Sequence, residues 1–210
     1  MMGIRERKKA ETRRALVDAA SELFAERGVQ ATTMDDIAHA AGMSRTSVFN
    51  YFGHKEMILC EIGARYVNQI AEPLRSAETT DPGQAFGAVT EALAELASRQ
   101  PALISAVARE TTHPDPERRR CARDTMGYSH LIDEMLDSLV AQGALRHPEY
   151  KESYGNQIID LLSGVLIRLA GVASRDELRR EIGRSLELFM RGAMREPTDA
   201  PARSVQLVSA

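Results

Sequence analysis

Residues 33–55 read TMDDIAHAAGMSRTSVFNYFGHK and describe two short helices separated by a glycine. Thr33 is an N-cap residue, and Asp36 follows three positions later, which is the spacing of a capping box. Gly42 comes where the first helix must end, because glycine adopts the left-handed conformation without steric cost. Ser44 then caps a second helix, whose Val48 packs back on the first. The pattern is typical of a helix-turn-helix.

The second helix of this motif carries side chains suited to nucleic acid. Arg45, Thr46, Ser47, Asn50 and Tyr51 are expected on its outer side. Short hydroxyl, amide and guanidinium groups form hydrogen bonds with base edges and phosphates. The motif therefore predicts a protein that binds double-stranded DNA.

Composition and charge agree with this prediction. The chain has 210 residues, a 43% hydrophobic content and a net charge of −3. The cations nevertheless cluster within residues 5–14, so a basic end precedes an acidic body, as expected for a protein that meets phosphates with one face. Cys60 and Cys121 lie far apart, and there is neither an apolar run long enough to span a bilayer nor a secretory signal. We expect a cytoplasmic protein with no membrane partner.

The rest of the chain is predicted to be all-α, with about nine helices in total. The helices are expected at about 9–26, from 34, from 45, from 55, at 84–99, from 101, through 126–139 to a stop near 143, at 151–172 and at 175–194. Three regions follow from this division. Residues 1–56 form a three-helix DNA-binding module, residues 57–195 form a helical ligand-binding and dimerisation domain, and residues 196–210 form a flexible tail.

The last two predicted helices indicate a dimer. The segment 158–172 is apolar around most of its circumference, so it must be covered on more than one side. Small residues at Gly164, Gly171, Gly183 and Gly192 permit close helix packing. The eighth and ninth helices are therefore expected to pair with their copies in a four-helix bundle. The alternative is a monomer in which these helices form the chain's own core.

Residues 12–60 resemble the N-terminal module of the TetR family, the tetracycline-repressor-like bacterial regulators. The matching pieces are ALVDAASELFAERG, TTMDDIAHAAGMS, the VFNYF run and the pair Lys55-Glu56. The resemblance implies that Arg45 recognises a guanine, and that Thr33 and Lys55 bind phosphates at helix N-termini. Phe49 replaces the tyrosine that is usual in the family. The DNA-binding residues implied are Thr33, Ser44, Arg45, Thr46, Ser47, Phe49, Asn50, Tyr51 and Lys55.

The resemblance also implies a mechanism. Two subunits hold their recognition helices ~34–36 Å apart on an inverted-repeat operator. An unknown small-molecule effector, largely apolar, binds among the helices between residues 55 and 172 and changes this spacing. From side-chain type and helix face, the expected pocket wall comprises Tyr66, Phe86, Met126, His130 and Met135. His130 is either satisfied within an apolar setting or available to the ligand.

Other functions are also compatible with the residues. No metal-ligand spacing, phosphate loop or nucleophile motif occurs, so neither a metal, a cofactor nor an enzyme is expected. The cluster of Arg109, Glu110, His113 and Asp115 is interpreted as loop solvation and helix capping. A ligand-released repressor is the leading hypothesis, followed by a constitutive regulator or activator without an inducer. The remaining alternative is an all-α interaction module or enzyme with a coincidental helix-turn-helix pattern.

Overall fold

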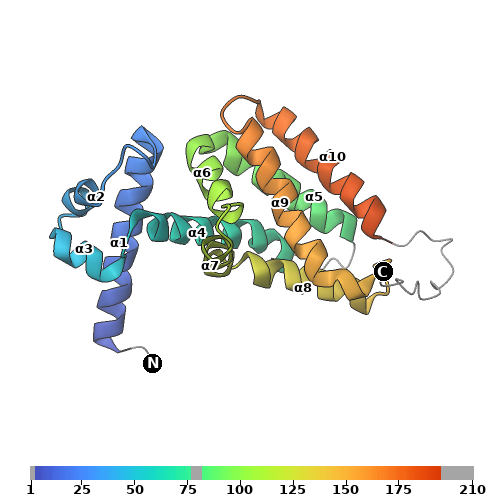
Figure 1. Cartoon of the computed structure of the whole chain (residues 1–210), viewed down its shortest axis with the longest axis horizontal. Helices are drawn as coiled ribbons and strands as arrows, with labels where there is room; N and C mark the ends of the chain where they lie inside the picture. The colour runs from blue at the N-terminus through green and yellow to red at the C-terminus, as the bar shows by residue number, and fades with distance from the viewer. Residues whose placement is uncertain (1–2, 77–81, 195–210) are drawn as a thin grey trace.

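The computed structural model describes residues 3–76 and 82–194, and this part of the chain is helical (Figure 1). The prediction of an all-α fold is confirmed, with ten α-helices in the described residues rather than about nine. The α-helices and one short 3-10 helix have these bounds: α1 Ile4–Arg27, α2 Met34–Ala40, α3 Arg45–Tyr51, α4 Lys55–Ser76, α5 Pro82–Arg99, α6 Pro101–Thr111, α7 Pro116–Met126, α8 Tyr128–Ala141, η1 Pro148–Tyr150, α9 Lys151–Leu169 and α10 Arg175–Ala193.

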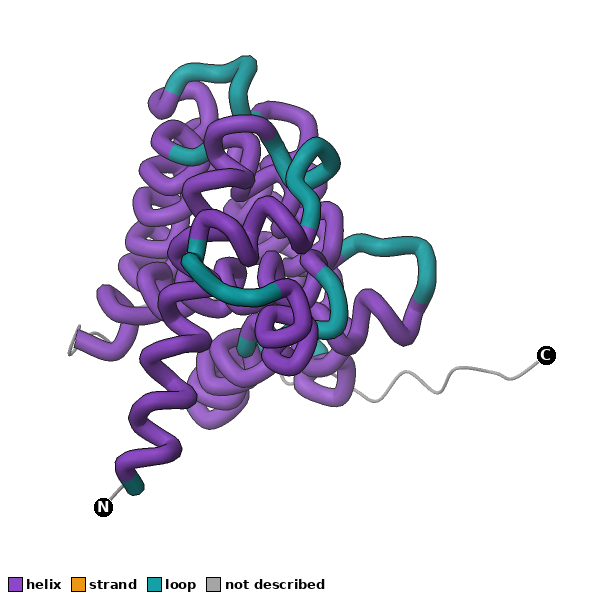
Figure 2. The backbone as a smooth tube through the Cα atoms, turned by 90° about the vertical axis from the view of Figure 1, so that its left-hand side faces the viewer, coloured by secondary structure: helices purple, strands orange, loops and turns teal. Residues whose placement is uncertain are grey.

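Helices α1 to α3 form the N-terminal head of the molecule, which faces the viewer in Figure 2. Its core consists of side chains that the sequence pattern places inside, and Phe24, Ile37 and Val48 have no exposed surface. The capping residues Thr33 and Ser44 begin α2 and α3 as predicted. Gly42 has φ +64° between the two helices, so the expected left-handed turn residue is confirmed.

Helix α4 connects the head to the body of the molecule (Figure 1). It begins beside the head and packs against α1, and further along it contacts α5, α6, α7 and α8. The predicted boundary at residues 56 and 57 falls inside this continuous helix. The head and the body therefore share one uninterrupted helix.

The body contains α5 to α10. Helix α10 packs mainly on α5 and also on α9, while α9 packs on α6, α8 and α10. The long apolar segment at 158–172 is thus covered by three helices of its own chain. Within the described ranges, no helix has the length and hydropathy needed to cross a membrane.

One helix expected to be continuous is divided in two. The sequence pattern predicts a single helix through residues 126–139, but Gly127 has φ +79° and ends α7 before α8 begins at Tyr128. The left-handed conformation at Gly127 redirects the chain. Met126 then packs against Gly63 of α4, where an added Cβ would lie 2.7 Å from the methionine sulfur. The predicted tail at 196–210 lies outside the described residues.

Candidate DNA-binding surface and ligand cavity

Helix α3 presents one polar side to solvent at the end of the head. The Ser44 hydroxyl oxygen accepts a hydrogen bond from the Ser47 backbone N–H at 3.2 Å, which fixes the first turn. Val48 is buried on the inner side of the helix. The exposed residues Arg45, Thr46, Phe49 and Asn50 share the outer side, at the spacing of one helical face. This surface is the arrangement that a recognition helix requires.

Arg45 is held in place by its neighbours but remains accessible. Its Nη1 atom lies 3.1 Å from Asp35 Oδ2 of α2, and its guanidinium carbon lies 5.5 Å from the centre of the Phe49 ring. The Arg45 side chain is 68% exposed. The contact with Asp35 uses only Nη1, so the other guanidinium donors stay available, and recognition of a guanine by Arg45 stays a prediction.

Thr33 and Asp36 form the predicted capping box. The Asp36 carboxylate accepts hydrogen bonds from the Thr33 N–H at 2.8 Å and from the Thr33 hydroxyl at 2.7 Å. These bonds, the hydroxyl first, lower the pKa of Asp36 below its ordinary value. Both donors that were expected to meet a phosphate are therefore engaged within the head. Phosphate binding by Thr33 stays a prediction that requires competition with Asp36.

Lys55 has an environment that the sequence pattern does not reveal. Its Nζ atom donates hydrogen bonds to three backbone carbonyl oxygens of the α1–α2 loop, at 2.7 Å to Val29, 3.3 Å to Gln30 and 3.0 Å to Thr32. An ammonium group has three donors, so these contacts use all of them. Lys55 thus ties the start of α4 to the head, and its predicted phosphate contact competes with the loop carbonyls.

Arg13 is a positioning residue that the sequence reasoning missed. It belongs to the basic segment 5–14, but its side chain is only 36% exposed and turns toward α3 and α4. Its Nη2 atom lies 2.6 Å from Glu61, Nη1 donates to the Tyr51 carbonyl at 3.2 Å, and the guanidinium lies 4.2 Å from the centre of the Phe52 ring. Arg13 therefore fixes the C-terminal end of α3, where the side chain of Tyr51 is half-buried. Because Glu61 lies 48 positions after Arg13, no local sequence pattern indicates that the two side chains pair.

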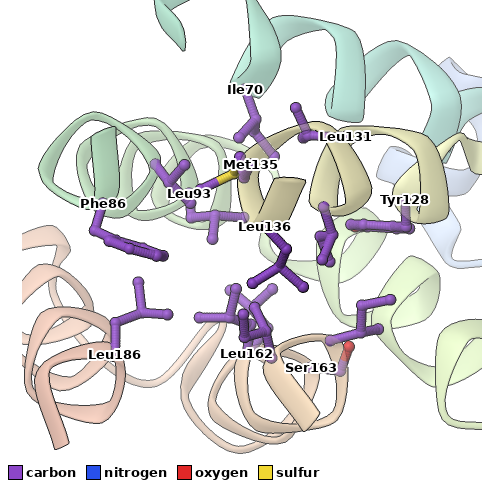
Figure 3. Close-up of a pocket in the computed structure, with 15 residues that line it drawn as sticks. Ile70, Phe86, Leu93, Tyr128, Leu131, Met135, Leu136, Leu162, Ser163 and Leu186 are labelled. Atoms are coloured by element: carbon purple, nitrogen blue, oxygen red, sulfur yellow. The ribbon is translucent and has the colours of Figure 1, made fainter. Parts of the chain in front are cut away.

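The body contains an apolar cavity between α8, α9 and the helices that face them (Figure 3). Its wall combines Ile70 of α4, Phe86 of α5, Met135 of α8, Leu162 of α9 and Leu186 of α10. The polar side chains on the wall are Tyr128 and Ser163, and burial raises the pKa of Tyr128 to about 12, so its phenol stays neutral. The cavity volume is ≈ 50 Å³. An apolar, uncharged group is the occupant that such a wall favours.

The five residues expected on a pocket wall do not all meet there. Phe86 and Met135 line the cavity, whereas Tyr66, Met126 and His130 do not. Tyr66 is buried and its hydroxyl donates to the Gln100 side chain, and Met126 packs on Gly63. The expectation of an apolar setting for His130 is wrong, because its side chain is 75% exposed and lies 3.2 Å from Glu134. The turn at Gly127 gives α8 a different rotation from a continuous helix.

No cluster of potential metal ligands occurs in the part of the chain that the structure describes. Near the predicted loop cluster, Glu110 accepts two hydrogen bonds from Arg118, each at 2.8 Å, and Asp115 caps α7. Cys60 is buried, which raises the pKa of its thiol to about 12. Such a thiol remains protonated at neutral pH and is a poor nucleophile.

Comparison with known proteins identifies both halves of the chain. Residues 16–62 match the family described as bacterial regulatory proteins, tetR family, and residues 64–192 match the TetR/AcrR family transcriptional repressors, C-terminal domain. The chain is 48% identical over 54 residues to the transcriptional repressor KstR2 of Rhodococcus jostii, which is 26% of each chain. It is also similar to the transcriptional activator FasR of Mycolicibacterium smegmatis, at 37% identity over 84 residues, 39% of this chain and 38% of that one.

A solved structure extends the similarity to the body. Thermus thermophilus FadR, a TetR family transcriptional repressor in complex with lauroyl-CoA, is 32% identical, with a TM-score of 0.74 over 92% of this chain and 100% of the other. The two family matches cover the exposed recognition helix and the body that carries the cavity. The chain belongs to the TetR family of bacterial regulatory proteins, and it is a DNA-binding transcriptional regulator rather than an enzyme.

Proposed function

We propose that the chain is a cytoplasmic repressor that binds an inverted-repeat operator as a homodimer and leaves it when an apolar small molecule binds in the body. The observation that carries this proposal is that α4 contributes Ile70 to the cavity wall and Lys55 to the head. A group that displaces the wall of the cavity therefore acts on the helix that carries the DNA-binding module. KstR2 and FadR, both similar to this chain, are repressors.

The proposed dimer forms through α9 and α10, which pack on each other. Each helix has an outward glycine, Gly164 and Gly192, and an added Cβ at either position would meet no atom within 4 Å. Leu188 of α10 is 66% exposed, and an exposed large apolar side chain is a candidate for contact with a partner. A second copy of the same two helices would cover Leu188 and pack closely at both glycines.

The proposed effector carries a long apolar chain. The cavity wall is almost entirely aliphatic and aromatic, and FadR of Thermus thermophilus binds lauroyl-CoA. A volume of ≈ 50 Å³ holds only a few water-sized groups, so a chain of twelve carbons must separate the helices that line it. Such a ligand prefers the expanded arrangement, and this difference in affinity is what shifts a population of conformations.

The test begins with selection of bound duplexes from a random pool, which supplies the operator sequence. Fluorescence anisotropy then measures operator binding with and without lauroyl-CoA and laurate. We expect an inverted repeat, binding by a dimer and release by at least one of the two compounds. Binding that no apolar compound reverses would favour a constitutive regulator, and stimulation of transcription from the operator would favour an activator such as FasR.

A further inference from the structure

A second hollow lies beside the apolar cavity and has a different chemistry. It has a volume of ≈ 640 Å³, which is within the range of small-molecule sites, and it lies between α7, α8 and α9. Its cations are Arg119, Arg120, Arg123 and Lys151. We name this hollow the basic cleft, and with the proposed function as its basis, we infer that it binds the phosphate-bearing head of the effector whose apolar chain enters the cavity.

The cavity and the basic cleft are adjacent. Ile132 of α8 and Ile159 of α9 line both of them. The two helices approach closely at Gly155, another residue of the cleft, where an added Cβ would lie 3.2 Å from Ile132 Cγ2. Two aliphatic side chains thus separate a polar space from an apolar one. A molecule with a charged end and an apolar tail would occupy both spaces by displacing the side chains of Ile132 and Ile159.

The cations of the cleft differ in how many hydrogen bonds and ion pairs they already make with the protein. Arg123 is 7% exposed, and its guanidinium donates to the Thr111 carbonyl, to Asn156 and to Asp160. Lys151 lies 2.7 Å from Asp137 and 3.6 Å from Asp133. These two cations are committed to carboxylates and stabilise the cleft itself.

Arg119 and Arg120 remain for a ligand. Arg119 donates through Nη1 to the His113 carbonyl at 2.5 Å, which leaves its second terminal nitrogen free to bind. Arg120 is exposed, and its guanidinium has no hydrogen bond or ion pair with any described residue. The carboxylates of Asp124, Asp133 and Glu152 also line the cleft. Asp133 of α8 and Glu152 of α9 disfavour an anion on that side, and Asp124 disfavours one near the C-terminal end of α7, so we place the phosphates against Arg119 and Arg120 in the N-terminal half of α7.

Guanidinium groups bind phosphate oxygens through paired, charge-assisted hydrogen bonds. The size of the cleft suits a nucleotide-like group more than a single carboxylate. The inferred ligand class is therefore an acyl chain joined through a thioester to a phosphorylated carrier such as coenzyme A, and not the free fatty acid. The phosphorylated part of the ligand supplies affinity in the cleft, and its acyl chain displaces the wall of the cavity.

The experiment compares lauroyl-CoA, laurate and coenzyme A alone on the full-length protein bound to its operator. We expect half-release by lauroyl-CoA at a concentration at least about tenfold below that of laurate, since charge-assisted bonds of this kind correspond to a tenfold or larger change in affinity. Coenzyme A alone is expected to compete with lauroyl-CoA without releasing the operator. Calorimetric titration of the protein without DNA measures binding independently of release.

Arg120→Gln is the diagnostic variant, because Arg120 is exposed and makes no hydrogen bond or ion pair with the described part of the chain. We expect it to raise the half-release concentration of lauroyl-CoA about tenfold and to leave the response to laurate unchanged. Arg179→Gln is the matched control, since Arg179 is an exposed arginine of α10 that lines neither hollow. Equal potency of laurate and lauroyl-CoA, with no effect of Arg120→Gln, would overturn the inference and leave the proposed function intact. Failure of every apolar compound to bind would overturn both.

Discussion

Replacing Lys55 with methionine distinguishes two roles for this residue. The substitution keeps the aliphatic stem and removes the ammonium group that donates to the Val29, Gln30 and Thr32 carbonyls. If Lys55 holds the head on α4, its loss destabilises the protein and leaves the number of phosphate contacts unchanged. If Lys55 binds a phosphate, its loss removes one contact with DNA.

The expected magnitude follows from the contacts. Hydrogen bonds to a charged group contribute about 1.5–3 kcal/mol each when they are protected from water. Lys55 is half-buried, and water replaces part of what is lost, so we expect a decrease of about 2 kcal/mol in the free energy of unfolding for the whole site. For a chain of this size, that decrease lowers Tm by roughly 4–8 °C.

The assay combines a thermal melt with operator affinity measured over a range of salt concentrations. Each phosphate contact contributes about 0.9 to the slope of log K against log salt. We expect Lys55→Met to lower Tm, to weaken binding to all duplexes alike and to leave the slope unchanged. Arg179→Gln, at an exposed position of α10 outside the basic segment 5–14, is the control for loss of a positive charge. An unchanged Tm together with a slope smaller by about 0.9 would refute the reasoning.

Three other substitutions test the recognition helix, the proposed dimer interface and the cap of α2. Arg45→Ala is expected to weaken operator binding by ~1–3 kcal/mol and to relax selection at one base pair, and a repeat of the duplex selection would detect an unchanged preference. Leu188→Glu places a charge in the proposed interface, so sedimentation should show monomers, and a persistent dimer would assign the interface elsewhere. Thr33→Val removes the α2 cap at a cost of about 1 kcal/mol. Because the pKa of Asp36 is lowered from 3.8, its stabilisation is present above that value and is lost as the pH falls through the lowered pKa, so acid unfolding should depend less on pH in the variant.

The sequence alone predicted the elements whose causes are local. A capping box needs two residues three positions apart, and a left-handed turn needs a glycine, so Thr33, Asp36 and Gly42 predict the limits of α2 directly. The apolar period likewise placed Ile37 and Val48 inside the head. Family resemblance added the function, because the helix-turn-helix is the part of the chain that DNA constrains.

Tertiary structure alone decided which distant groups meet. Lys55 reaches carbonyls 23 to 26 positions earlier, and Arg13 pairs with a carboxylate 48 positions later. The cavity wall depends on the rotation of α8 after Gly127, and that rotation turns His130 outward while Met135 lines the cavity. A sequence period indicates which side of a helix is apolar, but the angle between packed helices determines which apolar sides enclose a space. That angle is set by contacts such as Met126 on Gly63, which no local pattern encodes.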